Sequence, residues 1–386
     1  MNTWRPHTYR HIGEERGVDA TVLANAIATG RATLSVDRNL PPVFSLRHLA
    51  HLADVDYGFL RAIVSRNLSE PYKVFRIRKR SSGHGKQRFR TICVPDPDLM
   101  HVQRWINARV LSRAKPNPAS MAYAKGSTIY RVAEAHCRCK WMFKLDIVNF
   151  FESVSEIAVY RVFRGLGYQP LVSFEMARIC TRLGTDTMSR RRRRWNCVSG
   201  RCNVICAYAF DRMGHLPQGA PTSPMLANLA VRDFDMKVSQ IADRFGLVYT
   251  RYADDLTLST DDSTFDRARI ATVVGEIYSA MVSTGLSPNT SKTHVLPPGA
   301  RKVVLGLLVD RDKPYLPRAF KANLRQHLYY LRRPDVGPAA HTVRRKFVSV
   351  VGLRHHIEGL IAFAQQIEPS FAAKCKDELS KVDWPL

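Results

Sequence analysis

Aspartates end apolar, strand-like runs in two separate parts of the sequence. In LVYTRYADDLTLS, Asp254 and Asp255 separate two β-rich stretches of alternating side chains, which predicts a hairpin with both acids at its tip. In FKLDIVNFF, Asp146 ends a third strand-like stretch. Carboxylates on neighbouring strands can hold two divalent ions about 4 Å apart, an arrangement that catalyses phosphoryl transfer. Because Mg²⁺ prefers hard oxygen ligands, the three acids predict a magnesium site, although for the Asp-Asp pair alone an ordinary polar turn would be the favoured interpretation.

The elements that must position these acids mix strands and helices without regular alternation, so the predicted class is α+β. The runs YKVFRIRKR and KQRFRTICVP predict a hairpin with one charged face, because nearly every second residue in them is basic. Ser45 can cap a single helix whose apolar residues recur at helical spacing. These apolar residues are Leu46, Leu49, Leu52, Val55, Phe59, Leu60 and Ile63.

Three further helical regions follow along the chain. One runs from about Asp98 to Ser112. Another begins in LPQGAPTSPMLANLAV, where Thr222 or Ser223 can cap the helix and Pro224 can occupy its first position. The basic, apolar-striped region from about Arg318 predicts helices that are interrupted at PDVGPAA.

The charge of the chain indicates a polyanionic partner. Its 386 residues include 59 Lys and Arg against 33 Asp and Glu, a formal net charge of +26. An anionic membrane surface is disfavoured, because no apolar run reaches the roughly 18 residues that a membrane span needs. The start, MNTWRPHTYRHIGEERG, also lacks the apolar core of a secretory signal. We therefore expect a cytoplasmic protein that binds nucleic acid and no membrane.

The eight cysteines are too thinly spread for a disulfide framework in a chain of this length. A reducing, cytoplasmic compartment fits that pattern. Cys197, Cys202 and Cys206, with His215 beyond them, could bind Zn²⁺, but their spacings lack the paired CxxC knuckles of common zinc sites. Ordinary packing or surface cysteines are the favoured interpretation.

Three motifs together resemble those of reverse transcriptases. Tyr252-Ala253-Asp254-Asp255 looks like the YxDD box, and Asp146 matches the first aspartate of the palm. The run LPQGAPTSP, residues 216–224, matches the LPQGxPxSP box in order and spacing. The resemblance covers about residues 46–330 and is greatest to bacterial retron-type reverse transcriptases and the related defence-associated ones. It implies a right-hand polymerase with fingers, palm and thumb.

The resemblance divides the chain into three regions. Residues 1–44 form an N-terminal extension, residues 45–316 form the fingers and palm, and residues 317–386 form a helical thumb. A basic insertion near residues 185–214 interrupts the palm.

The resemblance also assigns individual residues. Asp146, the backbone carbonyl of Ile147, Asp254 and Asp255 would bind two Mg²⁺ ions. Phe151 would discriminate against the 2′-hydroxyl of the nucleotide, with a core role as the alternative, and Lys292 would protonate the leaving pyrophosphate, with a solvated lysine as the alternative. The dNTP contacts would be Phe151, Gln218, Gly219, Arg88 and Arg90, although the two arginines also fit an ordinary basic surface.

RNA contacts are expected at two places. Retron enzymes carry an NAxxH segment, and Val132-Ala133-Glu134-Ala135-His136 keeps its Ala and His but lacks its Asn; Val304-Leu305-Gly306 likewise departs from the family's VTG. His136 would contact RNA in that segment. Arg190, Arg191, Arg192, Arg193, Arg194 and Trp195 combine phosphate-binding charge with a stacking surface, for which a solvated loop is the alternative.

The resulting hypothesis is an RNA-directed DNA polymerase that copies a dedicated noncoding RNA into DNA with dNTPs and two Mg²⁺ ions. Its role would be antiphage defence, with a possible effector protein as partner. One alternative is an untemplated or protein-primed DNA polymerase. Another is an RNA-binding scaffold with an idle polymerase site. The sequence does not identify the RNA, the priming group or the oligomeric state.

Overall fold

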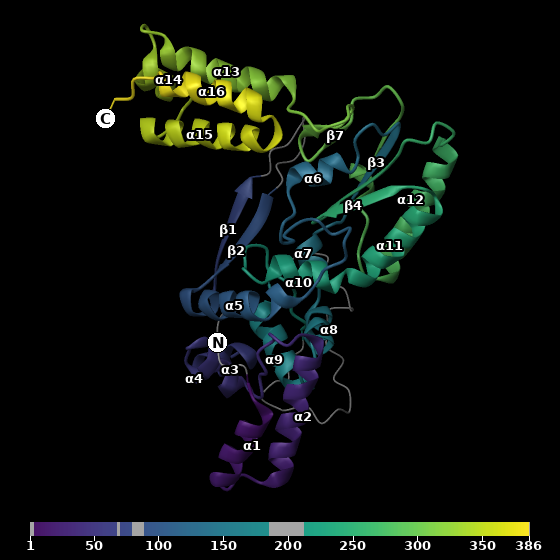
Figure 1. Ribbon diagram of the computed structural model, residues 1–386, viewed down its shortest axis with the longest axis vertical. Coiled ribbons are helices and arrows are strands. Elements are labelled where there is room, and N and C mark those ends of the chain that lie inside the picture. The colour runs from purple at the N-terminus through teal and green to yellow at the C-terminus, as the bar shows by residue number, and fades with distance from the viewer. Residues whose placement is uncertain (1–3, 68–69, 79–88, 185–211, 386) are drawn as a thin grey trace. The chain divides into compact units, whose positions relative to one another are not determined.

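The computed structural model describes residues 4–67, 70–78, 89–184 and 212–385 (Figure 1). Helices and strands mix along the described chain without regular alternation, which confirms the predicted α+β class. Two compact units are built from interleaved segments. The first comprises Met1–Ala124, Asp146–Gln240 and Glu276–Asn289, and the second comprises Lys125–Leu145, Ile241–Gly275 and Thr290–Leu386.

The described part of the first unit is mainly helical and includes one β-hairpin. Its helices are α1 (Pro6–Glu15), α2 (Ala20–Val36), α3 (Leu46–Ala53), α4 (Tyr57–Val64), α5 (Pro97–Arg109), the 3₁₀ helix η1 (Leu111–Arg113), α7 (Phe150–Ser153), α8 (Glu156–Gly165), α9 (Pro170–Cys180) and α10 (Ser223–Ala230). Two further helices, α11 (Arg232–Arg244) and α12 (Arg267–Ser283), pass from one unit's segments to the other's. Most residues of α9 are buried, so this helix belongs to the core of the first unit.

The predicted single helix after Ser45 is in fact two helices. The Ser45 hydroxyl accepts a hydrogen bond from the backbone N–H of His48 at 3.1 Å, so the predicted cap is confirmed. However, Asp54 has a φ of 52° and ends α3 in the left-handed conformation. Asp56 then caps α4 by accepting from the N–H of Phe59 at 2.6 Å. The apolar spacing extends across Asp54 and Asp56, so periodicity alone did not reveal the break. Aspartate favours caps and turns over helix interiors, and these two residues end one helix and begin the next.

The predicted basic hairpin and the helix after it are both present. Strands β1 (Tyr72–Arg78) and β2 (Phe89–Pro95) pair in antiparallel register from Tyr72 with Pro95 to Arg78 with Phe89. Helix α5 (Pro97–Arg109) follows, with a proline in its first turn, where the missing N–H costs no hydrogen bond. The predicted helix from about Asp98 to Ser112 therefore corresponds to α5 and the start of η1.

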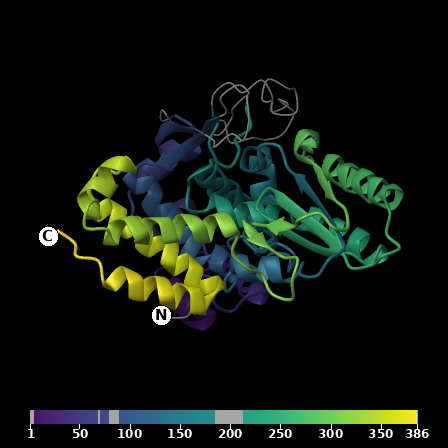
Figure 2. The same cartoon turned by 90° about the horizontal axis from the view of Figure 1, so that it is seen from above.

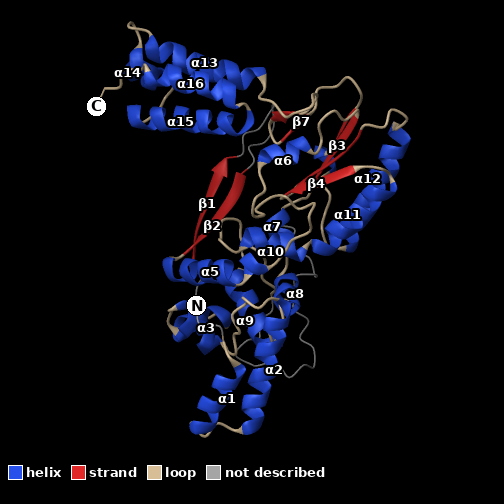
Figure 3. Cartoon of the chain, viewed as in Figure 1, coloured by secondary structure: helices blue, strands red, loops and turns tan. Residues whose placement is uncertain are grey.

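The second unit contains nearly all of a four-stranded sheet, whose strands β3 and β4 are labelled in Figure 3. Its strands are β3 (Trp141–Asp146), β4 (Val248–Tyr252), β5 (Asp255–Thr260) and β6 (His294–Leu296), in the order β4-β5-β3-β6. β4 pairs antiparallel with β5, and β3 pairs antiparallel with β6. The short helix α6 (Ile129–Glu134), the 3₁₀ helix η5 (Thr290–Lys292) and the two-stranded ribbon of β7 (Val303–Val304) and β8 (Leu307–Leu308) complete this part.

The C-terminal part of the second unit is helical, as the sequence predicts. Helices α13 (Arg318–Arg332), α14 (Gly337–Arg344), α15 (Val350–Ile367) and α16 (Pro369–Ser380) lie beside one another in both views (Figures 1 and 2). The predicted interruption at PDVGPAA is confirmed by its first three residues, which lie between α13 and α14, whereas its last four residues begin α14. The predicted extension, residues 1–44, lies within the first unit, and the predicted thumb lies within the second. The three-domain division remains a prediction.

Candidate active site

The Asp-Asp pair lies in a tight turn between β4 and β5, as the sequence predicts. Tyr252 pairs with Asp255, so Ala253 and Asp254 occupy the tip. Ala253 adopts a φ of 57°, and its carbonyl accepts a hydrogen bond from the guanidinium of Arg251 at 2.9 Å. The Arg251 side chain is fully buried and supports the turn from within. Asp254 is half-buried and Asp255 is exposed, so both carboxylates can meet solvent or a ligand.

Asp146 lies in a different environment, at the end of β3. Its side chain is only 4% exposed, and its Oδ1 accepts a hydrogen bond from the Asn289 amide at 2.7 Å. The backbone N–H of Asn289 also donates to the carbonyl of Asp146 at 2.8 Å. Two residues further on, Val148 N–H donates to Ser287 O at 2.9 Å. This pairing fixes both the backbone and the carboxylate of Asp146.

Asn289 is the residue at this site that sequence reasoning missed. In the run PNTSKT, the resemblance assigns a role to Lys292 and none to Asn289. Its amide holds one carboxylate oxygen of Asp146, so it orients a predicted metal ligand. The run itself was the signal that could have identified it, because an amide near acidic metal ligands is a common orienting partner.

The strand order makes neighbours of two strands that end in acids. Asp255 begins β5, Asp146 ends β3, and β5 adjoins β3 in the sheet. Among the described residues, no group of three or more His, Cys, Asp or Glu side chains is arranged closely enough to hold a metal ion by itself. The assignment of Asp146, Ile147, Asp254 and Asp255 to metal binding therefore remains a proposal. Ile147 is buried and forms an isolated β-bridge with Pro288.

Lys144 brings a half-buried cation to the same sheet. Burial lowers the pKa of its ammonium, and the nearby Asp255 carboxylate partly opposes that shift. Its Nζ donates a hydrogen bond to the carbonyl of Val303. Lys144 therefore links β3 to β7 and contributes positive potential near the acidic turn.

Phe151 lies just beyond β3, on the short helix α7. Asn149 precedes this helix with a φ of 48°. The Phe151 ring is half-buried, with its centroid 6.4 Å from the Tyr123 ring and 5.5 Å from the Phe150 ring. Phe150, by contrast, is 4% exposed and belongs to the core. The partial exposure of Phe151 leaves ring surface available to a ligand.

The Gln218–Gly219 segment rests on strand β2. The backbone N–H of Cys93 donates to the carbonyl of Gln218 at 2.8 Å. Gly219 has a φ of 118°, and a Cβ atom there would lie 3.0 Å from the carbonyl oxygen of Cys93. Glycine is therefore required by both its conformation and its close approach to β2. Helix α10 begins nearby with Pro224 in its first turn, but Thr222 forms no capping hydrogen bond, so the predicted side-chain cap is wrong.

Arg182 connects this segment to the start of β1. Its backbone N–H donates to the carbonyl of His215 at 3.0 Å, and the His215 N–H donates back at 2.9 Å. Its guanidinium donates to the Cys93 Sγ at 3.2 Å and forms an ion pair with Glu70. Arg182 thus connects the segment that precedes Gln218 to strand β2, against which Gln218 lies.

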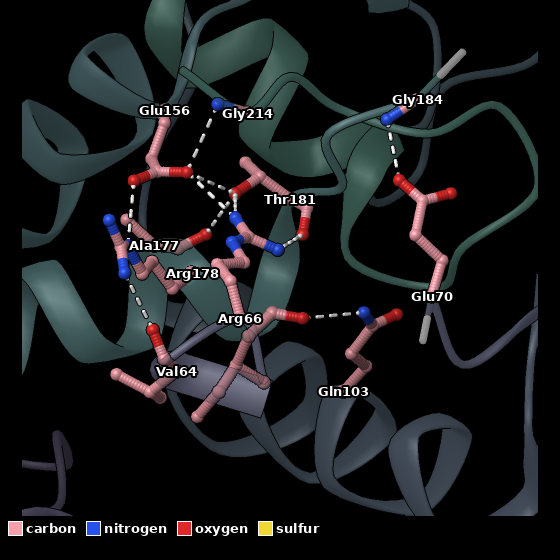
Figure 4. A network of polar contacts seen from close by, with 11 residues as sticks. Val64, Arg66, Glu70, Gln103, Glu156, Ala177, Arg178, Thr181, Gly184 and Gly214 are labelled. Carbon is pink, nitrogen blue, oxygen red and sulfur yellow. Dashed lines mark hydrogen bonds and ion pairs between the residues drawn. The ribbon is translucent and has the colours of Figure 1, made fainter. Parts of the chain in front are cut away.

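A second buried network joins the helices beneath this region (Figure 4). Glu156, the first residue of α8, forms ion pairs with Arg66 at 2.7 Å and Arg178 at 3.2 Å. Its carboxylate also accepts from the Thr181 hydroxyl and the Gly214 N–H, each at 3.2 Å. Burial raises the pKa of Glu156, but the two guanidinium groups outweigh that effect and lower it overall.

The remaining predicted contacts have different outcomes. Arg90 is exposed on β2 opposite Ile77, and Lys292 is exposed at the end of η5. Arg88 lies outside the described residues, as do Arg190, Arg191, Arg192, Arg193, Arg194 and Trp195. The three cysteines of the proposed cluster, Cys197, Cys202 and Cys206, also lie outside them. The described cysteines are free thiols: Cys93, Cys137, Cys139, Cys180 and Cys375.

The predicted RNA contact of His136 is not compatible with its position. Its side chain is fully buried, and its ring nitrogens hydrogen-bond the hydroxyls of Ser259 at 2.6 Å and Thr250 at 2.7 Å. Burial, with a smaller contribution from Lys144, lowers the pKa of His136 to about 3, so the ring is neutral at physiological pH. His136 instead supports the sheet from beneath β4 and β5.

The chain belongs to the reverse transcriptase (RNA-dependent DNA polymerase) family, whose family model matches residues 77–307. The mixed α+β fold with an acidic β4–β5 turn is that of a right-hand polymerase, and the chain is an enzyme of the RNA-directed DNA polymerase class. A telomerase structure from Candida albicans is also similar, with a TM-score of 0.42 and 13% identity over 83% of this chain and 57% of that one.

Curated relatives specify the type of reverse transcriptase. The chain is 27% identical over 292 residues to the retron Ec86 reverse transcriptase of Escherichia coli, covering 76% of this chain and 79% of that one. It is 29% identical over 306 residues to the retron Mx65 reverse transcriptase of Myxococcus xanthus, covering 78% and 63% respectively. It is 27% identical over 292 residues to the retron Mx162 reverse transcriptase of the same organism, covering 73% of this chain and 56% of that one. It is therefore a retron-type reverse transcriptase. No described helix is long and apolar enough to cross a membrane.

Proposed function

We propose that this enzyme copies a dedicated noncoding RNA into DNA by two-metal phosphoryl transfer, in the cytoplasm and in the service of antiphage defence. The observation that carries the proposal is the sheet order, in which the two acid-bearing strands β3 and β5 are neighbours. The N–H of Lys140, just before β3, donates to the carbonyl of Thr260, the last residue of β5, at 2.9 Å. Since the start of β3 meets the end of β5, the two strands run antiparallel, and their acid-bearing ends face the same edge of the sheet.

The donor set suits magnesium. Asp146, Asp254, Asp255 and the backbone carbonyl of Ile147 offer only hard oxygen ligands, which Mg²⁺ prefers to nitrogen or sulfur. Two bound Mg²⁺ ions would supply charge stabilisation for the attacking and leaving oxygens. The protein's own part is to orient the ligands. The Asn289 amide fixes one oxygen of Asp146, and Arg251 fixes the turn that presents Asp254 and Asp255.

The nucleotide would be held by residues around the first unit's hairpin. Gln218 and Gly219 would lie along the incoming dNTP, since their backbone is held against β2. Arg90, exposed on that strand, and Arg88 would bind the triphosphate through charge-assisted hydrogen bonds. Phe151 would exclude a 2′-hydroxyl, and Lys292 would donate a proton to the leaving pyrophosphate.

The defining experiment is primer extension with purified protein and the RNA that copurifies with it. We expect labelled dNTP incorporation that requires both RNA and Mg²⁺. Changing Asp254→Asn together with Asp255→Asn should abolish it, with a loss of at least about 10³-fold, because the charges that hold the metal ions are removed. A matched control exists in the second Asp-Asp pair, Asp261 and Asp262, just beyond β5. The same two substitutions there should leave activity intact.

Four results would contradict parts of the proposal. Synthesis that survives complete removal of RNA would indicate an untemplated polymerase, and labelled DNA covalently attached to the protein would indicate protein priming. Absence of incorporation under all conditions, with biological activity that depends on RNA binding alone, would indicate a scaffold with an idle site. Phage protection that persists in the Asp254→Asn, Asp255→Asn variant would separate the defence role from DNA synthesis.

A further inference from the structure

A long groove crosses the first unit, and among its lining residues in the described chain none belongs to the proposed polymerase site. It consists of two cavities of about 1030 Å³ and 260 Å³. The cavities share lining residues on α8, at the α10–α11 junction and at the end of α12, so they adjoin one another. These shared residues are Ala158, Arg161, Ala230, Val231 and Thr284. Such an arrangement suits an extended polymer better than a compact metabolite.

Five cations line the larger cavity. Its lining includes Arg113 and Lys115 after η1, Arg161 on α8, and Arg232 and Lys237 on α11. All five residues are exposed. Within the described chain, the side chains of the first four form no hydrogen bond or ion pair, and only the Lys237 ammonium has a partner, the Ser283 hydroxyl at 3.0 Å.

The two carboxylates in the same lining offset only part of this charge, since two acids face five cations. Asp37 accepts a hydrogen bond from the backbone N–H of Asn39 at 2.7 Å, which closes the turn after α2. Asp233 lies in the first turn of α11, where a negative charge stabilises the helix dipole. The groove is therefore left with excess positive charge that an anionic ligand would satisfy.

We propose that this groove binds an RNA strand through its phosphates, as a site separate from the polymerase site. Three of the five cations are arginines, whose planar guanidinium groups bind phosphate oxygens in bidentate fashion. A polynucleotide supplies phosphates at regular intervals along an extended groove, and the formal charge of +26 favours such a partner over an uncharged one. The site retains the RNA while a different segment of it is copied.

The test compares two variants that lower the net charge equally. Arg161→Gln with Arg232→Gln removes two groove cations. Arg31→Gln with Arg104→Gln removes two exposed arginines that lie outside the groove, on α2 and α5. The probe is a fluorescein-labelled, mixed-sequence, single-stranded RNA oligonucleotide, titrated with full-length protein over a range of salt concentrations. DNA synthesis on poly(rA) primed with oligo(dT) is measured in parallel.

We expect the groove variant to bind RNA about tenfold or more weakly than the control variant. For this variant, the slope of log affinity against log salt concentration should be shallower by about 0.7 for each cation lost. Synthesis on the short primed template should be retained, because the described lining of the groove includes none of the proposed polymerase residues. Crosslinking with thiouridine-labelled RNA should recover peptides from α8 and the start of α11 in the unmodified protein only.

The outcomes are distinguishable from failure of the proposed function, which would appear as absent synthesis by the unmodified protein. Equal RNA affinity and salt slope in the two variants would overturn the RNA site. So would groove-dependent binding of polyglutamate that RNA does not displace, because the occupant would then be an acidic protein segment. Equal groove-dependent affinity for DNA of the same sequence would overturn the assignment to RNA.

Discussion

The three aspartates of the proposed metal site have different surroundings, and these differences indicate separate roles. Asp146 is buried and its orientation is fixed by Asn289, so it can serve as a preset ligand. Asp254 and Asp255 are more accessible and depend on the backbone of the turn for their placement. Their distance from any future metal ion is set by the turn, so the turn itself must be rigid. Arg251 provides that rigidity from the interior.

Asn289→Ala should lower DNA synthesis by about 10-fold to 100-fold, because partners that orient a metal ligand have effects of that size. The variant should also need more Mg²⁺ for half-maximal activity, which a purely structural defect would not produce. The measurement is primer extension as a function of Mg²⁺ concentration. Asn25→Ala, at an exposed position on α2, is the matched control. Unchanged activity and unchanged Mg²⁺ dependence in Asn289→Ala would contradict the positioning role.

Phe151→Ala should admit ribonucleotides more readily, because the half-buried ring would no longer crowd the 2′ position of the sugar. We expect the ratio of kcat/KM for dNTP over rNTP to fall by about 10-fold to 100-fold, which corresponds to loss of one steric contact in the transition state. Phe151→Tyr keeps the ring and should preserve discrimination. If Phe151→Ala folds normally and discriminates as well as the unmodified protein, the ring has only a packing role.

At the level of elements, sequence reasoning succeeded where a local pattern dictated the structure. The alternation around Asp254 and the basic alternation of β1 and β2 both led to the correct hairpins. It failed where a short polar segment or a distant partner decided the outcome. The break at Asp54 depends on local caps that periodicity obscured. The burial of His136 depends on Thr250 and Ser259, more than one hundred residues away in sequence, which no local pattern reveals.

The Glu156 network is another long-range feature, and it connects α8, α9 and the residues after α4. Replacing Glu156 with Gln would leave Arg66 and Arg178 buried beside a neutral amide. The expected loss of unfolding free energy is about 3–5 kcal/mol, the usual effect of removing one partner from a buried ion pair. Chemical denaturation followed by circular dichroism measures this loss, and Glu14→Gln, exposed on α1, is the control. A loss below about 1 kcal/mol would mean that the guanidinium groups find other partners.

Across the whole molecule, acid should destabilise the fold through two kinds of group, a paired buried carboxylate and buried neutral histidines. Glu156 has a lowered pKa, so its stabilising contribution is present above the unfolded value near 4.5 and is lost as pH falls through the lower folded value. Histidines of the second unit behave differently. Burial lowers the pKa of His136 to about 3 and that of His327 to about 4. Both rings are neutral in the folded protein. Below about pH 6.5 the same histidines bind protons in the unfolded chain, so the unfolded state is favoured there.

His136 alone should cost about 2 kcal/mol of stability between about pH 7.5 and about pH 5, since its unfolded form binds a proton across most of that range and its folded form does not. Thermal unfolding followed by circular dichroism should therefore show a lower midpoint at the more acidic pH. His136→Gln can still hydrogen-bond but does not titrate, so the difference between the two midpoints should shrink in that variant. His7→Gln, exposed on α1, should leave the difference unchanged. An equal difference in all three proteins would show that His136 does not link protonation to folding.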